Sequence, residues 1–418
     1  MRKNVWILNH YAGNTLFNKG GRHYWIAQFL HDKGYNPVVF ASNSKNGIKQ
    51  KWIDSSALWI EKKAEEIDTP YIYVRSKIYS NNGLDRIKNM YDYYRNVIIA
   101  AKQYAKEHGK PDVVYASSVH PLTLVAGQKL ARHFGVKCIC EVRDLWPESL
   151  VVYGHLKRDS LLAKVLYSFE KRIYVKADKV VMTWPGGYDY IRDRGWDSVI
   201  PEDKVIHISN GVDLAKYKKN VAEHPYADEE LNDNSVKKII YTGSIREVNN
   251  LGIIVEAAKL LQSKGVQGFK ILVYGSGTER DALIKRVEEE HLSNIAFVGR
   301  VPKECVPAVL DKAYVSLLHN SSTELDKYGQ SQNKFFEYLA AGKPILMTYS
   351  VGHSICKENN CGFEIEKQSP GSIADAIEKI VKLSKDEYRM YSDNAEETAK
   401  LYDFRNLTMI LIDAIESL

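Results

Sequence analysis

The stretch Lys238-Ile239-Ile240-Tyr241-Thr242-Gly243 is a short β-branched run that ends in glycine, and a helical pattern follows it near 250–264. The chain then repeats this alternation, with helical patterns near 278–290 and 333–341 and with strand-like runs near 270–274, 295–298, 314–318 and 344–347. Short apolar strands that alternate with helices are typical of parallel sheets built from βαβ units. The segment therefore predicts a doubly wound α/β domain.

The same alternation fills the first half of the chain, with strands expected at 5–8, 38–41, 71–74, 113–116, 137–141, 179–183 and 205–208, and helices near 21–33, 85–108, 121–134 and 161–176. A polar, acidic stretch separates the halves. We therefore expect an N-terminal domain over 1–218, a linker over 219–236, a second domain over 237–395, and a C-terminal helix over 396–418 that crosses back to the first. Doubly wound sheets bind ligands outside the carboxyl ends of their strands, so two Rossmann-like domains facing across a cleft are expected.

The composition limits the class of protein. The chain has 418 residues, 44% of them apolar, and a net charge of 58 − 52 = +6, which excludes wholesale disorder and a dedicated nucleic-acid binder. No apolar run is long enough to span a membrane, and the amino terminus does not resemble a secretory signal. The five cysteines include no C-x-x-C pair, which favours reduced thiols and a cytoplasmic protein.

Several loops that follow strands carry residues suited to an anionic ligand. Gly20 and Gly21 precede a helix, where glycines let the backbone approach an anion, although a tight turn explains them equally well. After Gly243, the side chains of Ser244 and Arg246 are available to a phosphate, unless Arg246 pairs with Glu247. The remaining donor-side candidates in such loops are Asn249, Gly275, Arg300, Val301 and Asn333.

The densest segment runs from Gln330 to Ile345. It predicts a helix that starts after a polar loop and ends at Gly342. The helix start offers free N–H groups and Lys334 to a diphosphate, and Glu337 is placed to accept hydrogen bonds from a sugar diol. The alternative is an amphipathic helix in which Glu337 only favours the helix dipole.

In the first half, Arg143 and Asp144 directly follow a strand, and His120 follows another. We interpret them as candidate catalytic residues, with a structural pairing of Arg143 to Asp144 or Glu148 as the alternative. The stretch 156–179 is basic and amphipathic, which suits contact with an anionic membrane or simply a solvated helix face.

Together these segments resemble the retaining glycosyltransferases of family 4, which have the GT-B fold. The resemblance rests on landmarks in order: Gly20-Gly21, Arg143-Asp144-Leu145-Trp146-Pro147, Asn210-Gly211-Val212-Asp213, the Gly243 loop, Phe297-Val298-Gly299 and Lys334-Phe335-Phe336-Glu337-Tyr338-Leu339-Ala340-Ala341-Gly342-Lys343-Pro344. It implies transfer of a hexosyl or N-acetylhexosaminyl group from a nucleotide diphosphate sugar, with UDP expected, to a saccharide or polyprenyl-diphosphate-linked acceptor in surface polysaccharide assembly. The resemblance also implies that Glu337 binds the ribose, that the turn at 297–301 meets the base, and that no metal or other cofactor is needed.

The sequence departs from the family pattern at the diphosphate. Gly243-Ser244 and Asn249-Asn250 stand where the family often has cations, and Gly329 stands in place of an acidic residue eight positions before Glu337. Arg246 and Lys334 are the available replacements. Two alternatives follow: a nucleotide-sugar epimerase of the same fold, and a non-catalytic paralogue that binds a nucleotide sugar.

Overall fold

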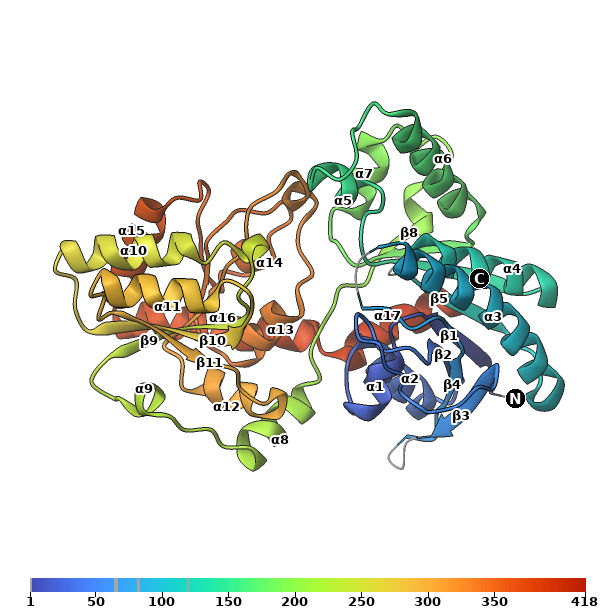
Figure 1. Cartoon of the computed structure of the whole chain (residues 1–418), viewed down its shortest axis with the longest axis horizontal. Helices are drawn as coiled ribbons and strands as arrows, with labels where there is room; N and C mark the ends of the chain where they lie inside the picture. The colour runs from blue at the N-terminus through green and yellow to red at the C-terminus, as the bar shows by residue number, and fades with distance from the viewer. Residues whose placement is uncertain (1, 64–66, 81–82, 119) are drawn as a thin grey trace. The chain divides into compact units, whose positions relative to one another are not determined.

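The computed structural model describes residues 2–63, 67–80, 83–118 and 120–418 (Figure 1). The chain forms two compact units: Met1–Ser209 with Phe404–Leu418, and Asn210–Asp403. We call them unit 1 and unit 2. Each contains its own sheet, so the predicted α/β class is confirmed.

Unit 1 is built on an eight-stranded sheet of order β3-β4-β2-β1-β5-β6-β7-β8. Its strands are β1 (Asn4–Asn9), β2 (Asn36–Ser42), β3 (Trp59–Lys63), β4 (Pro70–Val74), β5 (Val113–Ser117), β6 (Lys137–Val142), β7 (Lys179–Met182) and β8 (Val205–His207). All neighbouring pairs are parallel except β3 and β4. The sequence did not predict β3, an edge strand that is short and partly exposed. The strand order reverses between β1 and β5, where doubly wound sheets bind ligands.

The helices of unit 1 are α1 (Gly13–Phe17), α2 (Arg22–Asp32), α3 (Leu84–His108), α4 (Pro121–Phe134), α5 (Glu148–Val152), α6 (Leu161–Lys176), α7 (Gly187–Asp193) and α17 (Phe404–Glu416). Two of these helices, α4 and α6, begin at residues that favour a helix start. Proline stands at the first position of α4, whereas Ser160 Oγ accepts a hydrogen bond from Ala163 N at the start of α6.

Unit 2 is built on a parallel six-stranded sheet of order β11-β10-β9-β12-β13-β14. The strands are β9 (Lys237–Ser244), β10 (Phe269–Ser276), β11 (Ile295–Gly299), β12 (Val315–Leu318), β13 (Ile345–Met347) and β14 (Gly362–Glu364). Successive strand residues point to opposite faces, so Ile239 and Ile240 pack into different apolar clusters. The order reverses between β9 and β12, and the two strands are neighbours.

Helices cover both faces of this sheet. α10 (Gly252–Ser263), α11 (Arg280–Glu289) and α15 (Pro370–Val381) contribute to one cluster, and α8 (Leu214–Glu223), α9 (Glu229–Asn232), α12 (Val306–Asp311), α13 (Asn333–Ala340) and α16 (Lys385–Leu401) to the other. α14 (Ile355–Glu358) lies next to β14.

The boundary between the units lies at Ser209/Asn210, before the predicted end of the first domain at 218. The predicted linker 219–236 belongs to unit 2, as does the segment 210–218 before it, and Tyr217 and Leu231 both pack into the core of this unit. The composition of this segment is polar because most of its residues face solvent, while a few apolar side chains and ion pairs such as Lys270–Glu230 attach it to the sheet.

The chain returns to unit 1 later than expected. α16, which includes the start of the predicted crossing segment 396–418, belongs to unit 2, and the return begins at Phe404. α17, drawn in red, packs against α2, drawn in blue (Figure 1). The Arg405 guanidinium lies 4.8 Å from the Phe29 ring centre, and Lys3 pairs with Glu416 at 2.6 Å.

Candidate active site

In unit 2, Lys334 lies in the first turn of α13 at the point where the strand order reverses. Its Nζ donates to the carbonyl of His319, at 3.2 Å, and lies 4.5 Å from the centre of the Tyr241 ring. Burial lowers the pKa of Lys334 to about 8. No carboxylate within the described residues pairs with this part-buried ammonium, so its charge is met only by dipoles and a ring face.

Polar side chains after β9 and β12 form one connected group beside it. Ser244 Oγ donates to Asn249 Oδ1 at 2.8 Å, and Asn249 Nδ2 donates to Asn320 Oδ1 at 3.3 Å. His319 is buried, with Nδ1 2.6 Å from Thr348 Oγ1 and Nε2 3.1 Å from the Asn250 carbonyl. Burial lowers the pKa of His319 to about 4, so the imidazole is neutral near pH 7. The predicted residues Ser244, Asn249 and Lys334 thus lie at the same end of unit 2's sheet.

Glu337 lies one turn further along α13. Burial raises the pKa of its carboxyl group, and the Lys303 ammonium acts in the opposite direction. Within the described residues no side chain donates a hydrogen bond to Glu337, so this carboxylate is available to a ligand. Lys303 follows β11 closely, which indicates that Glu337 lies near the loop that holds Arg300 and Val301.

The other residues predicted to bind the donor differ in their exposure and surroundings. Arg246 and Asn333 are exposed, and no carboxylate in the described part of the chain pairs with Arg246, so the alternative pairing with Glu247 is not formed. Arg300 is exposed, whereas Val301 is buried. Gly275 lies within β10 opposite Gly243, where a Cβ atom would come within 1.8 Å of the Gly243 oxygen. The close approach of the Gly243 backbone therefore explains why position 275 is a glycine.

In unit 1, the predicted glycine loop joins α1 to α2. Gly21 caps α2 with a φ of 103°, a conformation that favours glycine. The next residue, Arg22, is buried, and its guanidinium bonds to Glu141 and to the carbonyls of Ile208 and Ser209. These contacts hold the start of α2 against the last residues of unit 1 before the boundary.

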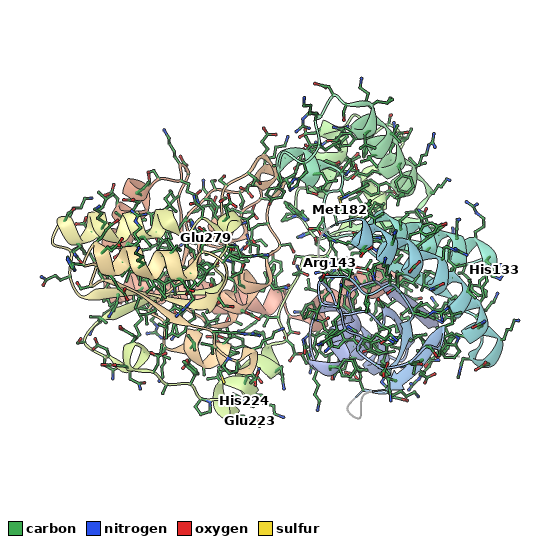
Figure 2. The ribbon with its side chains drawn as sticks, viewed as in Figure 1. His133, Arg143, Met182, Glu223, His224 and Glu279 are labelled. Atoms are coloured by element: carbon green, nitrogen blue, oxygen red, sulfur yellow. The ribbon has the colours of Figure 1, made fainter. Side chains whose placement is uncertain are left out.

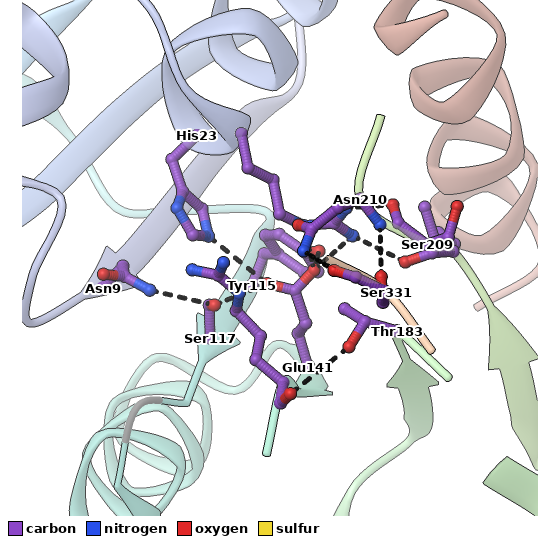
Figure 3. A network of polar contacts seen from close by, with 12 residues as sticks. Asn9, His23, Tyr115, Ser117, Glu141, Thr183, Ser209, Asn210 and Ser331 are labelled. Carbon is purple, nitrogen blue, oxygen red and sulfur yellow. Dashed lines mark hydrogen bonds and ion pairs between the residues drawn. The ribbon is translucent and has the colours of Figure 1, made fainter. Parts of the chain in front are cut away.

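Glu141 is the centre of this network (Figure 3). Arg22 Nε donates to Glu141 Oε1 at 2.6 Å and the Tyr115 hydroxyl donates to it at 2.5 Å, while Ser117 and His23 contact Oε2. Burial acts to raise the pKa of Glu141, but the Arg22 charge holds it well below its usual value. The sequence analysis missed this buried ion pair.

Arg143 and Met182 lie at the carboxyl ends of the adjacent strands β6 and β7 (Figure 2). The backbone of Arg143 is fixed, because its N–H donates to Ser118 Oγ and its carbonyl accepts from Trp184 Nε1, both at 3.1 Å. Its side chain has no ion pair within the described residues, its Nε has no hydrogen-bond partner, and burial lowers its pKa. Glu148 pairs instead with Arg158 at 2.7 Å, so the predicted structural alternatives for Arg143 are not formed.

His120 and Asp144 line one pocket of unit 1, together with Ser118, Trp146, Glu170 and Tyr174. His120 is buried, and its pKa falls to about 3 because of burial and the Arg86 charge. Its Nε2 lies 2.6 Å from Nδ1 of His10. The three predicted catalytic residues therefore follow the neighbouring strands β5 and β6, and the structure adds His10, which the sequence analysis overlooked.

The amphipathic stretch 156–179 contains α6. One side of this helix is buried through Ala163, Tyr167 and Ile173, whereas Leu161, Leu162 and Val165 are exposed. Leu161 is 78% exposed and the adjacent Leu162 is 58% exposed, so two neighbouring leucines face solvent. In the part of the chain that the structure describes, no helix has the length and apolarity required to cross a membrane.

The comparisons with known proteins agree with this architecture. Glycosyltransferase Family 4 matches residues 24–216, and Glycosyl transferases group 1 matches residues 236–382. The probable glycosyltransferase WbjE of Pseudomonas aeruginosa is 25% identical over 283 residues, which cover 65% of this chain and 66% of that protein. The chain thus spans just under two thirds of that relative.

Solved structures are similar over the full chain. A glycosyltransferase from Rickettsia africae has a TM-score of 0.66 at 15% identity and covers 100% of this chain with 98% of its own. HepE from Anabaena, solved with UDP, has a TM-score of 0.67 at 12% identity, with 100% of both chains covered. The E. coli trehalose-6-phosphate protein, bound with UDP-2-fluoro glucose, has a TM-score of 0.72 at 10% identity, with 100% of this chain and 99% of its own covered.

These matches define a glycosyltransferase built from two parallel-sheet units. The chain belongs to the family 4 type of glycosyltransferase, with the GT-B fold.

Proposed function

We propose that this protein transfers a sugar from a UDP-sugar to a saccharide or lipid-linked saccharide in surface polysaccharide assembly, with retention of configuration at the anomeric carbon. The observation that carries the proposal is Lys334, a part-buried cation without an anion at the reversal point of unit 2's sheet. A cation in this position is poised for a phosphate, because the alternative is an uncompensated charge. The UDP found in the Anabaena HepE structure supports the choice of nucleotide.

The donor diphosphate would bind Lys334 and the exposed Arg246, with Ser244 as a hydroxyl donor. Preorganised donors that meet the charge of a departing diphosphate stabilise the transition state directly. We therefore propose that transfer needs no metal ion. Activity that persists in a chelator such as EDTA is the expected result, and its loss with recovery on adding Mg²⁺ or Mn²⁺ would contradict this part of the proposal.

Glu337 would accept hydrogen bonds from the ribose hydroxyls, and the loop with Arg300 and Val301 would approach the base. Calorimetric titration with UDP, GDP and ADP tests the choice of base, and UDP should bind most tightly. In Glu337→Gln, affinity for UDP should fall by about tenfold, the order expected for a lost hydrogen bond to a charged acceptor. The exposed Glu396→Gln serves as the matched control, and its affinity should equal that of the wild type.

A nucleotide lacking the ribose hydroxyl makes this test specific. Wild-type protein should prefer UDP to 2′-deoxy-UDP, and Glu337→Gln should lose most of that preference. Equal preference in both proteins would show that Glu337 does not bind the ribose.

On the acceptor side, His120, Asp144 and Arg143 would contact the reacting sugar or its phosphate. Incubation of the protein with UDP-glucose, UDP-galactose and UDP-N-acetylglucosamine, with and without saccharide and polyprenyl-diphosphate-linked acceptors, tests transfer. Retention is read from the anomeric configuration of the product by NMR. Conversion of the nucleotide sugar without any acceptor would favour an epimerase, and binding without turnover would favour a non-catalytic protein.

We further propose that the exposed residues of α6 contact an anionic membrane that carries the acceptor. Leu161, Leu162 and Val165 offer apolar side chains, and the neighbouring Lys157 and Lys164 are exposed cations. This combination binds anionic bilayers through apolar insertion and charge attraction. The protein should sediment with phosphatidylglycerol vesicles but not with phosphatidylcholine vesicles. Leu161→Ser/Leu162→Ser should lose this binding, while Leu401→Ser, a substitution at an exposed leucine of unit 2, should retain it.

A further inference from the structure

His10 and His120 form a close pair inside unit 1. His10 directly follows β1 and His120 precedes α4, and the distance between His10 Nδ1 and His120 Nε2 is 2.6 Å. Both rings are at least 96% buried, and the His10 ring stacks on Tyr93 with 4.4 Å between centres. Burial lowers the pKa of both histidines, so both are neutral near pH 7. A single proton therefore lies between the two nitrogens, as an N–H···N hydrogen bond.

The orientation of Asn89 decides which histidine supplies that proton. Asn89 Nδ2 donates to Ser44 Oγ and to the Lys77 carbonyl, at 2.8 and 2.5 Å. The carbonyl can only accept, so the amide cannot be reversed, and Asn89 Oδ1 remains as a buried acceptor without a close partner.

Asn89 also acts on the His10 ring as a hydrogen-bonding side chain that favours its protonation. His10 Nε2 is likewise buried without a hydrogen-bond partner in the described residues. With Nδ1 facing His120, only Nε2 of His10 is left for the Asn89 oxygen. A proton on Nε2 provides the donor that this acceptor requires.

The remaining protons follow from that assignment. If His10 carries its proton on Nε2, its Nδ1 is bare and accepts the Nε2 proton of His120. His120 Nδ1 is then bare as well. This atom is buried without a partner in the described residues, and His120 lines the pocket that also contains Asp144.

We propose that His10 is a positioning residue that holds His120 in the tautomer with a bare Nδ1, so that His120 accepts a hydrogen bond from a substrate hydroxyl in this pocket. The assignment rests on the proposed function only for the role of that hydroxyl. The charged and titratable groups around the pair are Arg86 from α3, Asp144 after β6, and the hydroxyls of Tyr11 and Tyr93.

NMR of the protein labelled with ¹⁵N-histidine reads the tautomer directly, because a bare nitrogen and an N–H nitrogen have well-separated chemical shifts. In the wild type, His120 Nδ1 should have the shift of a bare nitrogen and Nε2 that of an N–H. His10→Phe keeps a ring on Tyr93 but removes both nitrogens, so His120 should become a mixture of tautomers. His10→Asn carries an amide oxygen close to the position of Nδ1 and should restore the wild-type tautomer.

Kinetics test the consequence. His10→Phe should lower kcat by roughly tenfold, the order expected when one hydrogen bond to the substrate is lost, with the KM for the UDP-sugar unchanged, and His10→Asn should recover most of the loss. Tyr93→Phe is the structural control: it removes the hydrogen bond from the Tyr93 hydroxyl to the Phe40 carbonyl but should leave tautomer and kcat unchanged.

A protonated His120 Nδ1 in the wild type would overturn the proposal, as would an unchanged tautomer or an unchanged kcat in His10→Phe. Failure of the proposed function looks different. A wild-type protein that neither binds UDP nor transfers sugar would refute the function, while its NMR spectrum would still decide the tautomer.

Discussion

Replacement of Lys334 by methionine should make the free protein more stable and its nucleotide binding weaker. Burial lowers the pKa of Lys334 from 10.5 to about 8, and at about 1.4 kcal/mol for each unit this corresponds to roughly 3 kcal/mol of destabilisation near pH 7. Methionine removes that cost but also loses the contact of the ammonium with the Tyr241 ring, which is worth about 1 kcal/mol. Since the side chain is only part-buried, solvent screening reduces the gain, and we expect Lys334→Met to raise the free energy of unfolding by about 1 kcal/mol.

The affinity for UDP should change in the opposite direction. A charge-assisted hydrogen bond to a phosphate contributes about 1.5 to 3 kcal/mol, so the Kd for UDP should rise by roughly ten- to a hundredfold. Urea denaturation of the free protein gives the first quantity and calorimetric titration the second. Lys385→Met, at an exposed lysine of unit 2, is the control and should change neither.

The pH dependence follows from the same pKa. The folded pKa of Lys334 is depressed, so the unfolded state binds more protons between pH 8 and 10.5, and the destabilisation by Lys334 should fade over that range. Affinity for UDP should decrease above pH 8 in the wild type as the ammonium loses its proton, and this component should be absent from Lys334→Met. A Lys334→Met variant that binds UDP as tightly as the wild type, or that is clearly less stable, would refute the reasoning.

Three further substitutions test buried charges of unit 1. Glu141→Gln leaves Arg22 without its counter-charge and should lower the free energy of unfolding by about 3 to 5 kcal/mol in urea titrations, whereas Lys3→Met, which breaks an exposed ion pair, should change it by less than about 1 kcal/mol. Burial raises the pKa of Glu170 to about 8 against a usual 4.5. Between pH 4.5 and 8 this carboxyl therefore ionises only in the unfolded state, and the free energy of unfolding should fall progressively over that range. The advantage of Glu170→Gln in thermal unfolding should therefore be larger at pH 8.5 than at pH 5, and an equal difference at both would be contrary to this assignment. Arg143→Met should leave the unfolding midpoint in urea unchanged or higher while it lowers kcat/KM, and a strongly destabilised variant would indicate a structural role.

The sequence predicted the elements with strong periodicity. The central strands and the helices α4 and α6 lie where the apolar patterns and capping residues placed them, because burial against a parallel sheet requires those patterns. The strand β3 was missed because its exposed edge position needs few apolar residues. The boundary was placed too late because local polarity alone cannot show that Tyr217 packs into the second core.

Of the candidate site residues, the sequence predicted those on strongly patterned helices and missed those that depend on contacts between distant segments. Lys334 and Glu337 lie on a well-signalled helix, so their position relative to the sheet of unit 2 could be anticipated. His10 could not be identified, because its partner His120 is distant in the chain and meets it only through the pairing of β1 with β5. The one available signal was a histidine directly after a strand, and this signal also describes His319, which bonds to Thr348 and a carbonyl.

The contrast between the buried cations separates structural residues from candidate binding residues. Arg22 and Arg143 both occur beside predicted ligand loops, and no sequence feature distinguishes them. In the folded chain, Arg22 uses its donors on Glu141 and on two carbonyls, so it has none to offer and acts by holding the start of α2. Arg143 forms no salt bridge among the described residues, although the charges of Glu141 and Asp144 act on it, and no described anion acts on Lys334. A buried charge without a hydrogen-bonded counter-ion costs stability. A cost of this kind at the carboxyl ends of parallel strands is best explained by an anion that arrives with the substrate, which is why Arg143 and Lys334, rather than Arg22, are the residues whose loss should reduce turnover without unfolding the protein.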